Sequence, residues 1–105
     1  MLNAIPKLNT VFMEYSAEVF QEGALSLKTK ALIAVAVSLA VGCGKCAVSH
    51  TAAARQLGAT DTEIREAIAV AEIIAAGSVR VLAADLGTED PGPGTRAPGR
   101  QSCCG

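Results

Sequence analysis

Apolar residues recur at helical spacing along most of the chain. The first apolar stripe lies within a helix that we expect over Lys7–Gln21, because its members follow one another at intervals of four and three residues. These members are Leu8, Phe12, Tyr15 and Val19. No segment shows the alternation of apolar and polar residues that is typical of a half-buried β-strand. The pattern therefore predicts an all-α fold.

The second and third expected helices follow in quick succession. The second, Leu27–Val41, begins after Ser26, a residue type that commonly caps helix N-termini. It is apolar on all sides after Lys30, so we expect it to be the central, buried helix. Gly42 is expected to end the second helix, because glycine often stands just past the end of a helix. The third expected helix, Cys43–Leu57, begins directly after it.

The fourth expected helix begins at Thr60, which is followed three residues later by Glu63, as in a capping box. Gly77 is expected to break or kink this helix, which leaves Ser78–Leu86 as a short last helix. The sequence thus predicts a small bundle of about five helices. The expected apolar face of the fourth helix carries Ile64, Ile68, Ala71 and Ala75.

Composition changes at Gly87 and divides the chain into two parts. Residues 87–105 hold five of the ten glycines, three of the four prolines and almost nothing apolar. Such a segment cannot bury enough surface to order itself, so we expect a helical domain over residues 1–86 and a flexible tail over 87–105. The tail carries the vicinal pair Cys103 and Cys104.

Overall composition narrows the class of protein. Of 105 residues, 50% are hydrophobic, 3% aromatic and twenty are alanine, which favours closely packed helices. A net charge of −1 argues against a nucleic-acid or acidic-membrane binder. The longest uncharged run, between Lys30 and Lys45, has 14 residues, against the ~20 that span a bilayer. With no secretory signal recognisable, we expect a cytoplasmic protein with no membrane contact.

One segment carries a motif for chemistry. Cys43, Cys46 and His50 form the pattern C-x-x-C-x-x-x-H, which puts all three side chains on one face of a helix. Residues three apart rise only ~4.5 Å along the axis, so the two thiols can form a disulfide with little backbone movement. The first turn of a helix favours a thiolate, and Lys45 adds a positive charge nearby. His50, the only histidine in the chain, is placed to accept a thiol proton.

Two other interpretations of these residues stay open. Buried cysteines in an alanine-rich core are often inert small hydrophobes. A zinc site would use Cys43, Cys46 and His50, but residues 1–86 offer no further cysteine or histidine as its fourth ligand. Cys103 and Cys104 offer soft ligands, so a soft-metal or metalloid-binding protein is the alternative function. We expect redox chemistry, with no resident metal or cofactor.

Around this motif the sequence resembles the carboxymuconolactone decarboxylase superfamily, over roughly residues 7–86. Leu27–Val37 looks like the helix that precedes the active site in that superfamily. The cysteine motif with the residues after it resembles the alkylhydroperoxidase, or AhpD-type, branch. Those residues are Gly42–His50, Ala53, Leu57–Thr60 and Glu63–Ala67.

The resemblance implies an AhpD-like helical fold, a homo-oligomer that is often a trimer or hexamer, and thiol-dependent reduction of hydroperoxides. It implies that Cys46 attacks the peroxide, that Cys43 resolves the resulting sulfenic acid, and that His50 belongs to a proton relay. A dithiol reductant, lipoyl or thioredoxin-like, then resets the pair. A member of the superfamily that is not a peroxidase is the other alternative.

The chain departs from the resembled family at Ala31, where the family commonly has a glutamate of the proton relay. Alanine cannot move a proton, so a carboxylate would have to come from elsewhere. The position before the second cysteine, often acidic, aromatic or histidine in relatives, is Lys45. The candidates for a replacement carboxylate are Glu14, Glu18, Glu22 and Glu72.

Overall fold

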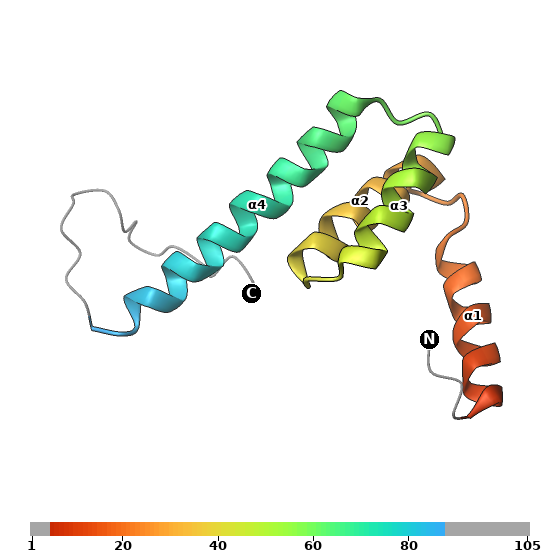
Figure 1. Cartoon of the computed structure of the whole chain (residues 1–105), viewed down its shortest axis with the longest axis horizontal. Helices are drawn as coiled ribbons and strands as arrows, with labels where there is room; N and C mark the ends of the chain where they lie inside the picture. The colour runs from red at the N-terminus through yellow and green to blue at the C-terminus, as the bar shows by residue number, and fades with distance from the viewer. Residues whose placement is uncertain (1–4, 88–105) are drawn as a thin grey trace.

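The computed structural model describes residues 5–87, which form four α-helices and no strand (Figure 1). The all-α prediction is therefore confirmed for this part of the chain. The expected tail lies, apart from Gly87, outside the described residues, and so do Cys103 and Cys104. The helices are α1 (Pro6–Val19), α2 (Leu27–Ala40), α3 (Gly44–Gln56) and α4 (Asp61–Ala84).

The expected break at Gly77 is wrong, and this reduces the helix count from five to four. Helix α4 runs through Gly77 without interruption and absorbs the short last helix expected over Ser78–Leu86. A glycine inside a helix costs only about 1 kcal/mol relative to alanine, so good helix formers on both sides can carry the helix across it. Among the described glycines, positive φ occurs at Gly42, Gly58 and Gly87, which lie at or beyond helix ends.

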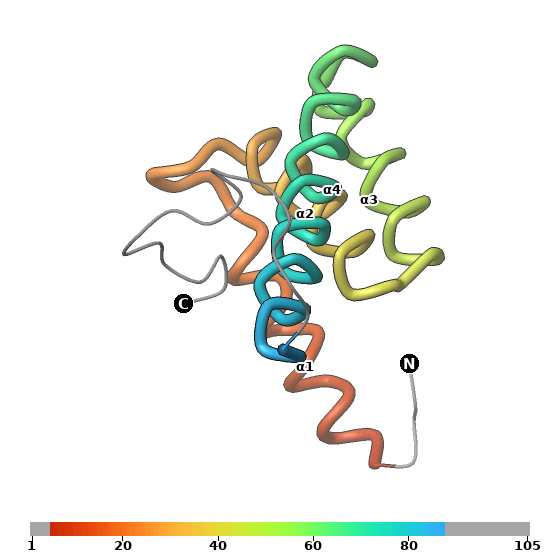
Figure 2. The backbone as a smooth tube through the Cα atoms, turned by 90° about the vertical axis from the view of Figure 1, so that its left-hand side faces the viewer, coloured from red at the N-terminus to blue at the C-terminus, as the bar shows by residue number. Residues whose placement is uncertain are grey.

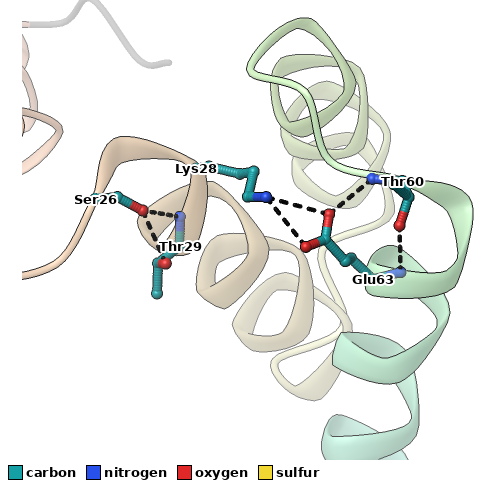
Figure 3. A network of polar contacts seen from close by, with 5 residues as sticks. All are labelled: Ser26, Lys28, Thr29, Thr60 and Glu63. Atoms are coloured by element: carbon teal, nitrogen blue, oxygen red, sulfur yellow. Dashed lines mark hydrogen bonds and ion pairs between the residues drawn. The ribbon is translucent and has the colours of Figure 1, made fainter.

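The predicted helix starts at Ser26 and Thr60 are confirmed by hydrogen bonds. The Ser26 hydroxyl accepts from the N–H of Thr29 at 3.0 Å. At the start of α4, the Thr60 hydroxyl accepts from the N–H of Glu63 at 3.1 Å, and a Glu63 carboxylate oxygen accepts from the N–H of Thr60 at 2.9 Å (Figure 3). This reciprocal pair satisfies two of the donors that a helix N-terminus leaves unpaired.

The core forms where α2 packs against α3 and α4. Figure 2 shows α4 lying across α2, with α3 beside them. Small side chains let the three helices approach closely, and one buried cluster joins them. Its members are Ala31 on α2, Ala54 on α3, Ala59 in the following turn and Ile64 on α4.

Helix α2 is central, as expected, but it is not buried on all sides. Ala31, Val35 and Ser38 are buried, whereas Ile33 and Val37 are about half exposed. The physical reason is that two neighbouring helices cover only one side of a third. The remaining apolar side of α2 is only partly covered within the described residues.

Helix α1 stands apart from the other three helices (Figures 1 and 2). None of its residues is buried, and the apolar stripe predicted on it is exposed. The radius of gyration is accordingly 17.8 Å, against about 12–13 Å for a compact domain of this length. The exposed stripe consists of Leu8, Phe12, Tyr15 and Val19.

A polar clamp joins the start of α2 to the start of α4. The Lys28 ammonium donates to both carboxylate oxygens of Glu63, at 3.0 and 3.3 Å (Figure 3). The Thr60 N–H, and after it the Lys28 ammonium, hold the pKa of the Glu63 carboxyl below its usual range. A carboxylate with a lowered pKa stabilises the fold above its unfolded-state pKa, and this contribution is lost as the pH falls through the folded-state pKa.

We therefore expect Glu63→Gln to lower the melting temperature at pH 7, because the amide loses both the ion pair and the stronger cap. The difference from the parent should shrink at acidic pH, where the parent's Glu63 is itself protonated. Thermal unfolding followed by circular dichroism across this pH range measures it. Glu66→Gln, on the same helix and exposed, is the control, and an equal effect of the two substitutions would contradict the clamp.

Candidate functional site

A tight turn at Gly42 positions the cysteine motif. Gly42 has φ +80°, a conformation that L-residues with a side chain rarely adopt. The N–H of Gly42 donates to the Leu39 carbonyl at 3.1 Å, and the N–H of Cys43 donates to the Ser38 carbonyl at 2.8 Å. These bonds end α2 in a Schellman motif and reverse the chain at once into α3. Helix α3 thus begins where the first cysteine stands.

The two cysteines of the motif are joined by a disulfide. Cys43 is the N-cap of α3, and its Sγ also accepts a hydrogen bond from the N–H of Cys46 at 3.3 Å. The Cα atoms lie 5.3 Å apart, within the usual range for a disulfide. The spacing argument from the sequence is confirmed on this point. Both sulfurs lie in the first turn of the helix, where unpaired N–H groups and the helix dipole favour a thiolate.

His50 lies one helical turn beyond Cys46 on α3, on the same face of the helix. It is half-buried, and its ring stacks on Phe20 with 5.6 Å between centroids and 18° between planes. Sequence reasoning missed Phe20, because the helix expected over Lys7–Gln21 included it. The structure ends α1 two residues earlier, at Val19, so that the chain turns and directs Phe20 toward α3.

An open groove of about 620 Å³ runs from the end of α1 to this histidine. Its walls are mostly apolar, and its polar groups are the side chains of Glu18, Lys30, Ser38 and His50. Two lining residues connect the groove to the cysteine motif: the Ser38 carbonyl accepts the N–H of Cys43, and His50 belongs to the motif itself, although neither cysteine is part of the lining. The apolar residues of the lining are Val19, Phe20, Leu25, Ile33, Ala34 and Val37.

The candidate replacement carboxylates fall in different places. Glu18 lines the groove with His50, whereas Glu22 accepts a hydrogen bond from the N–H of Leu27 at 3.1 Å. Glu14 and Glu72 are exposed and lie outside the groove lining. Of the four, the structure brings only Glu18 to the groove.

Ala31 and Lys45, the two departures from the resembled family, lie in different surroundings. Ala31 is 3% exposed and packs in the core cluster. Lys45 is exposed in the first turn of α3. Within residues 5–87, no three His, Cys, Asp or Glu side chains lie together so as to hold a metal ion.

Comparison with known proteins connects this site to a family. The sequence model of the carboxymuconolactone decarboxylase family matches residues 6–89. A Paracoccus denitrificans protein, named uncharacterized protein 4 in the cox locus, is 44% identical over 71 residues, which are 68% of this chain and 64% of that protein. The alkyl hydroperoxide reductase AhpD of Azorhizobium caulinodans is 39% identical over 56 residues, 53% of this chain and 31% of that protein. The chain spans less than two thirds of either relative, and no solved structure matches it.

The turn at Gly42 can be tested against its twin at Gly58, which ends α3 in the same motif with φ +93°. At neither glycine would an added Cβ meet an atom within 4 Å, so an alanine is strained only by its backbone conformation. Gly42→Ala and Gly58→Ala should each cost about 1 kcal/mol of unfolding free energy, measured in urea. Only Gly42→Ala should speed reduction of the disulfide by dithiothreitol, by up to about 5-fold, because it loosens the turn that holds Cys43. Equal acceleration in both variants would show that the turn has no local effect on the pair.

Proposed function

We propose that this chain, which belongs to the carboxymuconolactone decarboxylase family, is a thiol-dependent oxidoreductase that reduces hydroperoxides. The observation that carries the proposal is the Cys43–Cys46 disulfide at the start of α3, with His50 one turn further on. The similarity to an alkyl hydroperoxide reductase over about half of the chain supports it. The cysteine pair favours this chemistry over that of a family member that is not a peroxidase.

In the proposed reaction Cys46 is the nucleophile, because it lies four residues from His50 and Cys43 lies seven. His50 takes the thiol proton, and the thiolate attacks one peroxide oxygen. A sulfur–oxygen bond forms as the oxygen–oxygen bond breaks, and the leaving alkoxide takes the proton back from His50 and departs as the alcohol. Cys46 is then a sulfenic acid, oxidised by two electrons, and the peroxide has been reduced by two.

Cys43 closes the cycle. Its thiol sulfur attacks the sulfur of the Cys46 sulfenic acid, the disulfide forms, and the hydroxyl leaves as water. The disulfide present in the structure corresponds to this product. A dithiol donor, lipoyl or thioredoxin-like, returns two electrons and two protons by thiol–disulfide exchange.

Cys46→Ser should reduce peroxide consumption to the uncatalysed rate, because serine cannot replace a thiolate nucleophile at neutral pH. Cys43→Ser should still react once and leave one sulfenic acid on Cys46, since the resolving thiol is gone. Stopped-flow peroxide assays and mass spectrometry after sulfenic-acid trapping measure the two effects. A Cys103→Ser/Cys104→Ser variant, which keeps both site cysteines, is the control. Equal consumption by the parent and Cys46→Ser would remove the proposal.

We also propose that the chain works as a homo-oligomer. Only seven of the described residues are buried, while large apolar side chains are exposed on every helix. Exposed apolar area on this scale is typical of a surface that a partner covers. The side chains that most need cover lie on α1, on the free side of α2 and on α4, such as Phe12, Val37 and Ile73.

Helix α4 admits a second explanation of its exposed face. It is long and apolar enough, by length and composition alone, to cross a membrane, and only 6% of its most apolar stretch is buried. That part of α4 contains Glu72 and Arg80, however, and a charge near a bilayer centre costs about 2.5–3.5 kcal/mol or more. Two such charges make a bilayer a poor environment for α4. They favour the surface of a partner protein, whose rim can be polar, as the surface that covers its exposed apolar face.

Phe12→Asp should weaken self-association by about 10–100-fold, because burying a phenylalanine side chain contributes roughly 1.5–3 kcal/mol. Ala17→Asp adds the same charge on the opposite side of α1, away from the stripe, and should leave association unchanged. Sedimentation or light scattering at micromolar concentration measures both. A parent that is a stable monomer, or equal loss in the two variants, would contradict the proposed interface.

A further inference from the structure

The end of α1 is held against the site on both sides of Phe20. The Lys30 ammonium on α2 donates to the carbonyl oxygens of Val19 at 2.8 Å and of Gln21 at 2.7 Å. Between these two residues, the ring of Phe20 stacks on the ring of His50. The last turn of α1 is therefore anchored beside the histidine, although the rest of the helix extends away from the other three (Figure 1).

Glu18 belongs to this anchored turn and lines the same groove as His50. Among the described residues of the lining, Glu18 is the one acid and Lys30 is the one other side chain with a permanent charge. Helix α4 contributes no residue to the lining, and the two charged side chains of α3, Lys45 and Arg55, are exposed and lie outside it, Arg55 being paired with Asp61. An acid and the histidine of the motif thus share one groove.

The other positions considered for an acid are occupied differently. Ala31 is buried in the core cluster beside Ala54, so a longer acidic side chain there would displace packed atoms. The Glu22 carboxylate already accepts the N–H of Leu27. Glu63 is bound by Lys28 at the far end of α2. Glu18 is the one carboxylate among the described lining residues that also include His50.

The stacking geometry leaves His50 able to use both ring nitrogens. Phe20 covers a face of the imidazole, whereas the two nitrogens direct their hydrogen bonds along the plane of the ring. One nitrogen can then accept a proton from a thiol while the N–H of the other donates to a carboxylate. A carboxylate partner fixes the tautomer of the imidazole and stabilises its protonated form.

We propose that Glu18 is the positioning residue that accepts a hydrogen bond from His50 and raises its basicity toward the Cys46 thiol. The inference rests on the proposed function for its role in the reaction. In this step the S–H bond of Cys46 breaks, its electron pair stays on sulfur, and the proton moves to the free imidazole nitrogen. The imidazolium so formed is paired with the Glu18 carboxylate, and no electron is transferred.

The first experiment is an NMR titration of His50 and does not depend on peroxidase activity. Because the chain has one histidine, its ring ¹⁵N signals report on His50 alone, and the titration is followed in the oxidised protein. Glu18→Gln should move the midpoint of this titration to lower pH, since the protonated ring loses its partner. Glu14→Gln, one turn earlier on α1 and outside the groove lining, should leave it unchanged. A midpoint that stays the same in Glu18→Gln would overturn the inference.

The second experiment measures hydrogen peroxide consumption against pH. Glu18→Gln should be slower by about 10-fold, with the rising limb of its profile moved to lower pH, and Glu18→Asp should recover part of the rate. His50→Ala sets the rate without the base. If Glu18→Gln keeps the parent rate and profile while His50→Ala is slow, the positioning role is overturned. If the titration shifts but no variant or parent consumes peroxide, the Glu18–His50 pair stands and the peroxidase proposal falls.

Discussion

The left-handed turn at Gly42 is the constraint on which the site depends. It ends α2 and starts α3 with a single residue between the cap of one helix and the cap of the next. This reversal lays α3 back along α2, so that Ala54 meets Ala31, and it places Cys43 where a helix N-terminus begins. The helix pairing that forms the core and the dipole that favours a thiolate therefore have the same origin.

Features that arise between near neighbours in the chain can be predicted from the sequence. The caps at Ser26 and Thr60 and the disulfide between Cys43 and Cys46 involve residues only three apart, so residue type and spacing suffice. Gly77 shows the limit of such rules, because a weak local penalty does not end a helix whose other residues favour it.

Contacts between residues that are far apart in the chain could not be predicted from the sequence. Phe20 reaches His50 across thirty positions because α1 ends early and Lys30 binds the carbonyls on either side of Phe20, and no periodicity encodes that contact. The same holds for Glu18, whose place in the groove depends on where α1 is anchored. What covers the apolar sides of α1 and α2 likewise depends on other elements, so the sequence of either helix alone does not predict it.

The burial of Ala31 has a consequence for how this protein can evolve. Ala31 shares a buried cluster with Ala54, which is fully enclosed, so a change of Ala31 to glutamate alone would bring both excess volume and a carboxylate into the core. An acid at this position would have to arrive together with substitutions that open space and supply a hydrogen-bond donor. A single step from Ala31 to an acid therefore carries a cost in stability that an acid on an exposed helix face does not.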